Sequence, residues 1–195
     1  MANKTKFNQI LIITLVFLTV LSCKDTEKRV DKLEIARQYY RTLDKSSSIE
    51  MKALLTDILV TVIPKYNYKV TFSKDDYVEK WLKWDSVFEP DYKVLDMKLD
   101  NGVVKAKVSK TDRRILFFMQ KPFVTNETLI IKNNKIIRVE TAYVNFDEVT
   151  WERNRNRLLN WIDENHPELN GFIFDQTEAG GLKFLKAIEL YKSNL

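Results

Sequence analysis

The 195-residue sequence has little cysteine and histidine, with one of each, and little glycine and proline, with four of each. A single cysteine cannot form an internal disulfide, and one cysteine with one histidine provides no ligand set for zinc. With 12% aromatic residues and no low-complexity stretch, the chain is also unlike a disordered protein. We therefore expect a domain held together by its hydrophobic core, with no metal and no cofactor.

An excess of one charge is also lacking, because 32 basic and 27 acidic side chains are interspersed along the chain. A protein that binds nucleic acid usually gathers basic residues on one surface, where contacts with phosphates release counterions. No such block is present, so we expect no nucleic-acid partner. The length suits one domain rather than two.

The first residues follow the three-part plan of a secretory signal. Lys4 and Lys6 precede an apolar run, ILIITLVFLTVL, which ends at the small residue Ser22. As a helix, this run covers about 20 Å, which is short for a hydrocarbon core of about 30 Å. An uncleaved signal anchor is the alternative, but the charged residues that follow Cys23 at once favour cleavage.

Residues 20–23, Val-Leu-Ser-Cys, resemble the lipobox of bacterial lipoproteins, although Leu21 stands where a small residue is usual. The resemblance implies a signal peptide over residues 1–22, lipid attachment at Cys23 and a lipidated tether over residues 23–30. Acyl chains such as palmitate would anchor the protein to a membrane. Residues 24–27 also resemble a short acidic signal for the outer membrane, so we expect a lipid-anchored protein of the cell envelope.

Helical spacing predicts two helices at the start of the remaining domain, residues 31–195. Apolar residues recur three and four positions apart over residues 31–44. Ser47 and Glu50 form a capping box, which predicts a second helix whose apolar face extends to Ile58. The next residues, up to 72, are rich in β-branched and aromatic side chains but contain a proline, and they predict an edge strand or an irregular extended segment.

A third helix is predicted to begin at Ser73, which has Asp76 three residues further on as a capping signal, and to stop before Pro90. One face of this helix carries an aromatic stripe that must pack on a large partner. The stripe consists of Tyr77, Trp81, Trp84 and Phe88.

The middle of the chain predicts that partner, an antiparallel sheet. Residues 92–99 and 103–109 alternate in polarity around Asn101-Gly102, a strong signal for a tight hairpin. Residues 114–120, 123–132 and 135–144 are predicted to continue the meander to about five strands, with Asn133-Asn134 at a second turn. Two C-terminal helices are then predicted, with Asn145 and Asp175 as their caps.

Helices followed by a curled meander predict an α+β domain in which the N-terminal helices pack on the sheet. This order of elements resembles the nuclear transport factor 2-like superfamily, which includes SnoaL-like cyclases and ketosteroid isomerase. The resemblance rests on the helical pair ending near Ile58, the helix containing Trp81 and the strands closing at residues 135–144. It covers about residues 31–145, so the two C-terminal helices would be an addition.

The resemblance implies a cone-shaped domain whose curled sheet surrounds an apolar cavity, a shape that suits small hydrophobic molecules. Aromatic residues on the predicted elements could line this cavity, although ordinary core packing would explain them equally well. The possible lining residues are Tyr40, Trp81, Trp84, Phe118 and Tyr143.

No catalytic residue can be assigned from the sequence. Glu127 and Glu140 lie in predicted strands, and each could point either into the cavity, where desolvation would raise its pKa, or into water.

His166 stands at a predicted helix end, where an imidazole can simply complement the helix dipole. Arg153 and Arg157 share a helix face that could bind an anion or be solvated. The pair Gly180-Gly181 could hold an anion or permit close packing.

Our leading hypothesis is a non-catalytic lipoprotein domain that binds a small apolar ligand or an envelope protein. The alternative is an isomerase, dehydratase or cyclase that acts on a hydrophobic molecule. Two or more buried ionisable groups in the cavity wall would favour the enzyme, and a wall of only aliphatic and aromatic groups would favour binding. A purely structural protein would instead have an exposed apolar patch and no cavity.

Overall fold

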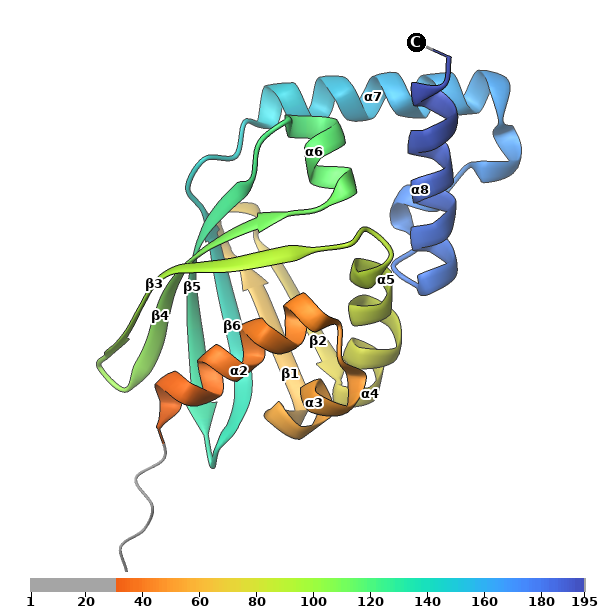
Figure 1. The fold of residues 1–195 in the computed structure, drawn as a ribbon. Coiled ribbons are helices and arrows are strands. Elements are labelled where there is room, and N and C mark those ends of the chain that lie inside the picture. The colour runs from red at the N-terminus through yellow and green to blue at the C-terminus, as the bar shows by residue number, and fades with distance from the viewer. Residues whose placement is uncertain (1–30, 195) are drawn as a thin grey trace, which may run out of the picture. The chain divides into compact units, whose positions relative to one another are not determined.

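A curved six-stranded sheet forms the centre of the computed structural model, which describes residues 31–194 (Figure 1). The strand order is β2-β1-β6-β5-β4-β3, and neighbours are antiparallel except for β1 and β6, which are parallel. The strands are β1 (Leu55–Ile63), β2 (Tyr68–Ser73), β3 (Asp91–Asp100), β4 (Val103–Thr111), β5 (Phe123–Lys132) and β6 (Lys135–Tyr143). The predicted α+β class is confirmed, with one more strand than expected and one parallel pair.

The two hairpin turns form where the sequence predicts them. Asn101 and Gly102 join β3 to β4 with φ of 48° and 81°, and Asn133 and Asn134 join β5 to β6 with φ of 47° and 63°. These left-handed conformations belong to type I′ turns, which match the twist of the strands and favour asparagine and glycine. The turns therefore fix the register of both hairpins.

The first two helices are α2 (Lys32–Lys45) and α3 (Ser48–Leu54), capped by the side chains of Asp31 and Ser47. The prediction that the second helix continues to Ile58 is wrong. The chain enters β1 directly after α3, and Ile58 is 53% exposed in that strand. Residues 55–63 are rich in β-branched side chains and pair with both β2 and β6, so sheet pairing outweighs the local helical spacing.

The third predicted helix is one helical segment over residues 74–86. It comprises α4 (Lys74–Asp76), the π-helical stretch η3 (Tyr77–Leu82) and α5 (Lys83–Ser86), and the Ser73 side chain caps it. The residues before this segment form the hairpin of β1 and β2, joined by the short turn η2 (Pro64–Tyr66). The predicted edge strand is therefore two strands, of which β2 lies at the sheet edge.

Residues 114–120 are not a strand, as the apolar run suggested, but belong to helix α6 (Arg113–Met119). The Asp112 carboxylate caps this helix by accepting a hydrogen bond from the Ile115 N–H at 2.6 Å. Ile115, Phe118 and Met119 are buried together because helical spacing places them on one face. A short apolar run does not distinguish strand from helix, and the cap at Asp112 is the decisive local signal.

Two long helices end the chain as predicted: α7 (Glu148–Asn165) and α8 (Glu178–Lys192), with the short turns η4 (Pro167–Leu169) and η5 (Phe172–Phe174) between them. Their caps are Asp147 and Thr177, two residues after the predicted Asn145 and Asp175. Asn145 instead accepts a hydrogen bond from the Val124 N–H in β5 and donates one to the Pro122 carbonyl oxygen just before β5. Asp175 accepts hydrogen bonds from Thr177.

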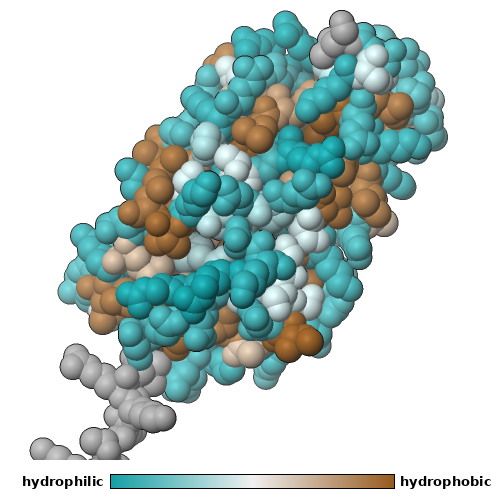
Figure 2. Space-filling view, in the orientation of Figure 1, coloured by the Kyte–Doolittle hydropathy of each residue, from teal (hydrophilic) through white to brown (hydrophobic). Residues whose placement is uncertain are grey.

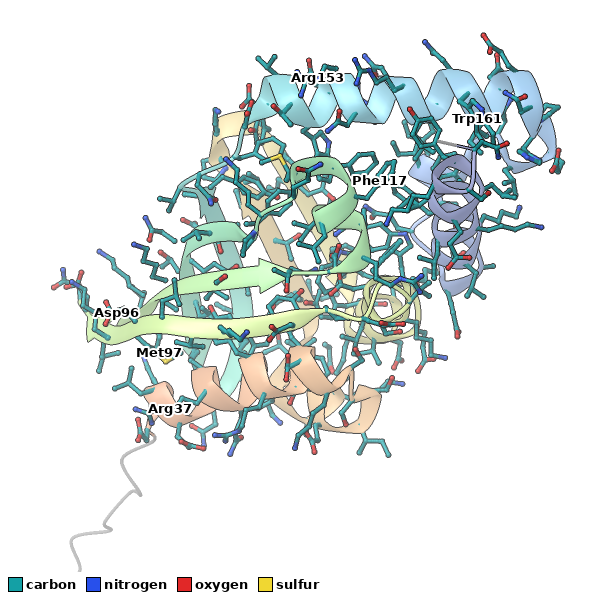
Figure 3. All side chains as sticks on the ribbon, turned by 45° about the horizontal axis from the view of Figure 1, so that its top comes forward. Arg37, Asp96, Met97, Phe117, Arg153 and Trp161 are labelled. Carbon is teal, nitrogen blue, oxygen red and sulfur yellow. The ribbon has the colours of Figure 1, made fainter. Side chains whose placement is uncertain are left out.

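The buried side chains form two clusters. The first fills the space between the sheet, α2, α3 and the helical segment 74–86, and the second joins α5 and α6 to α7 and α8. In Figure 3, Trp161 lies on α7 near α8, whereas Arg153 lies on the exposed side of α7. Both clusters lie within the unit of residues 31–195, so this unit has the cores it needs to fold by itself.

The surface of the described residues is mixed. Figure 2 shows hydrophilic residues over most of one face, with small hydrophobic groups scattered between them. None of the helices in residues 31–194 is both long and apolar enough to cross a membrane. The predicted signal peptide, Cys23 and tether lie outside the described residues.

Candidate functional site

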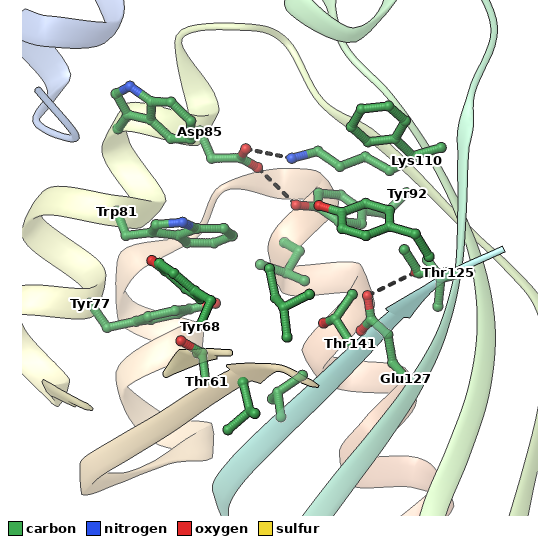
Figure 4. Close-up of a pocket in the computed structure, with 18 of the residues that line it drawn as sticks. Thr61, Tyr68, Tyr77, Trp81, Asp85, Tyr92, Lys110, Thr125, Glu127 and Thr141 are labelled. Atoms are coloured by element: carbon green, nitrogen blue, oxygen red, sulfur yellow. Dashed lines mark hydrogen bonds and ion pairs between the residues drawn. The ribbon is translucent and has the colours of Figure 1, made fainter. Parts of the chain in front are cut away.

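A cavity of about 340 Å³ lies between the sheet, α2, α6 and the helical segment 74–86 (Figure 4). All six strands contribute side chains to its wall. Aromatic rings form much of this wall, and the rings of Tyr77 and Trp81 stack with centroids 4.9 Å apart and an angle of 16°. The π-helical stretch η3 contains both rings, and such stretches are frequent at functional sites.

Three of the five aromatic residues proposed from the sequence line this cavity: Trp81, Trp84 and Tyr143. Tyr40 does not line the cavity, but its hydroxyl donates to Glu127 Oε2 at 2.9 Å and so supports a group in the wall. Phe118 lies in the second cluster, 4.5 Å from the ring of Trp151. Its position follows from α6 being a helix, which turns this ring toward α7.

Glu127 faces the cavity from β5, where it pairs with Thr141 of β6. Its two oxygens accept hydrogen bonds from Tyr40 and, at 3.1 Å, from Thr125 Oγ1. Burial raises the pKa of Glu127, and the two hydroxyl donors offset only part of this effect. The wall therefore holds a carboxyl group that can exchange a proton closer to neutral pH than an exposed glutamate.

Glu140 lies on the opposite face of the sheet. It pairs with Thr128 in the register, one position away from the inward-facing Thr141, and Arg138 bonds to its carboxylate at 2.7 Å. Successive side chains of a strand point to opposite faces, so the alternation that places Thr141 inside places Glu140 outside. Between the two glutamates, only Glu127 belongs to the cavity.

A second ionisable group in the wall is Asp85, which is only 1% exposed. Its carboxylate accepts hydrogen bonds from the Tyr92 hydroxyl at 2.9 Å and from Lys110 Nζ at 2.5 Å (Figure 4). Lys110 also lies 3.6 Å from Asp112, whose carboxylate accepts a hydrogen bond from Arg114 at 3.0 Å. Asp85, Lys110, Asp112 and Arg114 thus form a charge network, with two groups of each sign.

Neighbouring charges determine the protonation state of Asp112. Burial would raise the pKa of Asp112, but the neighbouring charges of Arg114 and Lys110 and the Ile115 N–H lower it further than burial raises it. Asp112 is therefore held as a carboxylate. Burial also raises the pKa values of the wall tyrosines Tyr77 and Tyr92, which keeps their hydroxyls protonated.

Sequence reasoning missed the cavity positions of Asp85, Lys110 and Arg114. One signal was available for Lys110, because it continues the inward-facing series of Val104, Ala106 and Val108 in β4. A charged side chain at an inward position of a strand needs a buried partner. Asp85 and Arg114 give no comparable signal, since their roles depend on how α5 and α6 meet β4.

The remaining sequence candidates lie away from the cavity lining. His166 follows α7, with Nδ1 3.3 Å from Glu168 Oε1. Gly180 permits close packing, since a Cβ there would lie 2.1 Å from the Asp175 carbonyl oxygen. Arg153 and Arg157 are exposed on α7. Within residues 31–194, no group of three histidine, cysteine or acidic side chains could hold a metal ion.

Comparison with known proteins gives structural neighbours only, since no family model and no curated protein matches the chain. A candidate ketosteroid isomerase from Kribbella flavida is 19% identical, covering 60% of this chain and 80% of its own, with a TM-score of 0.49. A candidate polyketide cyclase from Streptomyces antibioticus is 11% identical, with 65% and 99% covered and a TM-score of 0.49. An NTF2-like protein of unknown function from Cytophaga hutchinsonii is 9% identical, with 61% and 95% covered and a TM-score of 0.47. These values assign no activity.

Proposed function

We propose that the domain of residues 31–195 binds a small molecule with a flat apolar body in the cavity between the sheet and its helices. The observation that carries this proposal is the cavity of about 340 Å³ with stacked aromatic rings in its wall. A volume of this size lies in the range of small-molecule sites, and aromatic walls contribute dispersion and area burial with flat ligands.

The test of binding uses Thr141, a small wall residue on β6. Thr141→Phe places a ring in the cavity and should weaken the binding of 2-acetylnaphthalene, measured by isothermal titration calorimetry, by more than about tenfold, since the probe and the ring compete for one space. Val149→Phe is the matched control, because Val149 is 75% exposed on α7. Equal affinity of the Thr141→Phe variant and the unchanged domain would contradict the proposal.

A second candidate function, proton transfer on the bound molecule, is favoured by the ionisable groups in the wall. Glu127 has a raised pKa, and Asp85 and Lys110 form a buried pair in the same cavity. These groups meet the criterion that separates an enzyme from a purely apolar binding site. In this reaction the Glu127 carboxylate takes a proton from a carbon next to a carbonyl group, and the protonated carboxyl then returns a proton to the same or a neighbouring carbon.

This candidate is tested with 2-tetralone, an aromatic ketone whose acidic C–H groups exchange with deuterated water. The unchanged domain should accelerate the exchange, followed by NMR, and Glu127→Gln should reduce the acceleration by roughly 10²-fold or more while the ketone still binds. Glu140→Gln, on the opposite face of the sheet, should exchange as the unchanged domain does. Acceleration that persists in Glu127→Gln would rule out Glu127 as the base, and no acceleration by the unchanged domain would leave binding as its only proposed function.

We also propose that the protein is a lipoprotein of the cell envelope, anchored to a membrane through acyl chains on Cys23. The support is the sequence of the first 30 residues: a short apolar run, a small residue and a lone cysteine followed by charged residues. Cys23→Ala should abolish the incorporation of labelled fatty acid in the producing bacterium. A Cys23→Ala variant that still carries labelled acyl chains would refute the anchor.

A further inference from the structure

The guanidinium of Arg114 lines the cavity, and most of its hydrogen-bonding capacity is unused. A guanidinium carries five N–H donors. Among residues 31–194, only Asp112 accepts from it, through one terminal nitrogen at 3.0 Å. The Nε–H is buried and has no partner in the described chain. Buried donors are nearly always paired, so an unpaired one calls for an explanation.

The neighbours of Arg114 hold this group in a fixed orientation. Its guanidinium carbon lies 4.6 Å from the centroid of the Trp84 ring and 5.0 Å from that of the Phe88 ring. Its partner Asp112 is itself fixed, because the same carboxylate caps α6 through the Ile115 N–H. Donors that are already oriented lose little conformational entropy when an acceptor arrives.

The charge around Arg114 indicates which kind of acceptor fits. Asp85 and Asp112 balance Lys110 and Arg114, so this end of the cavity has no net positive charge with which to attract an anion. Recognition there depends on hydrogen bonds more than on charge attraction. A neutral carbonyl oxygen accepts such bonds without adding a third negative charge next to the two carboxylates.

We infer that Arg114 is the residue that determines ligand specificity in this cavity: its guanidinium donates a hydrogen bond to a carbonyl oxygen of the bound molecule. The inference rests on the proposed binding function. It narrows the ligand class to compounds that combine a flat apolar body with an oxygen acceptor, and it gives Arg114 a role that helix and sheet packing do not require.

A matched pair of probes tests the inference: 2-acetylnaphthalene, with a carbonyl oxygen, and 2-isopropenylnaphthalene, with a CH₂ group in its place. The unchanged domain should bind the ketone roughly tenfold more tightly, which is the expected effect of one hydrogen bond from a charged donor. Arg114→Met should bring the ratio of the two affinities close to one. Arg113→Met is the control, because Arg113 is exposed and pairs with Glu189 instead.

Arg114→Met also removes a charge beside Asp112, so its folding is checked by near-ultraviolet circular dichroism. If that variant does not fold, Arg114→Lys is measured in its place. This variant keeps the charge but loses the fork of donors, so the ratio of the affinities for the two probes should fall at least threefold. Equal binding of both probes to the unchanged domain overturns the inference and leaves the binding proposal intact. Binding of neither probe overturns the binding proposal, and the inference with it.

Discussion

At the scale of single residues, Glu127 accepts hydrogen bonds from two neutral hydroxyl groups, those of Tyr40 and Thr125. Burial raises its pKa above the ordinary value of 4.5, so the folded protein binds this proton more tightly than the unfolded chain does. The contribution of Glu127 to the free energy of unfolding therefore falls as the pH rises from about 4.5 to the pKa in the folded state.

Glu127→Gln should remove this fall in the free energy of unfolding, because glutamine has no proton to lose as the pH rises. Relative to the unchanged domain, the variant should gain stability between pH 4.5 and pH 8, measured by urea unfolding at both values. Glu140→Gln, at a half-buried ion pair on the other sheet face, should show no such gain. If the free energies of the unchanged domain and of Glu127→Gln run in parallel over this pH range, the carboxyl is not desolvated.

Asp112 has the opposite behaviour, since its lowered pKa keeps it ionised between two cations. Asp112→Ala removes the cap of α6 and leaves Arg114 without its only partner in the described residues, and it should destabilise the domain by about 3–5 kcal/mol. Asp112→Asn keeps an oxygen for the cap and should cost clearly less. Chemical unfolding at pH 7 measures both, and equal losses would show that the cap contributes little.

At the scale of elements, the first turn of α8 packs closely against the preceding residue Asp175. Alanine normally stabilises a helix by about 1 kcal/mol relative to glycine. At Gly180, however, a Cβ would collide with the Asp175 carbonyl oxygen, so Gly180→Ala should destabilise the domain by about 1–3 kcal/mol. Leu182→Ala, at an exposed position of the same helix, should change the stability by less than about 0.5 kcal/mol. Thermal unfolding compares the two, and a stabilising Gly180→Ala would contradict the packing argument.

Local signals predict the elements whose ends are fixed locally. Ser47 and Ser73 cap helices as predicted, and the asparagine turns form the predicted hairpins. The errors have two causes, pairing between distant strands and a local cap that the prediction from the apolar run overlooked. Residues 55–58 leave the helical pattern because β1 pairs with β2 and β6, and residues 114–119 form α6 because Asp112 supplies a cap.

At the scale of the whole described molecule, α7 and α8 are required parts of the fold. They cover the second cluster, in which Phe88 and Phe118 contact Phe184 of α8 and Phe118 also contacts Trp151 of α7. A chain ending at residue 145 would expose this cluster, so we expect it to aggregate or to be degraded by protease much faster than residues 31–195. Limited proteolysis measures this, and a stable truncated domain would show that the helices are dispensable.

The same scale limits what the sequence reveals of the site. The aromatic stripe was predictable from its spacing, but its predicted partner is only half right, because Trp84 and Phe88 pack with the C-terminal helices rather than on the sheet. The charge network is not predictable, because Asp85, Lys110 and Arg114 come from three elements that only the folded sheet brings together. A single strand pattern could also not decide between Glu127 and Glu140, and only the register with β6 does so.

The parallel join between β1 and β6 also affects how the protein is made. β1 is complete at Ile63, but its neighbour does not begin until Lys135, so the first hairpin has an unpaired edge during most of synthesis. Contacts between such distant parts of a chain form slowly. The hairpin of β1 and β2 can therefore join the rest of the sheet only after β6 has been synthesised.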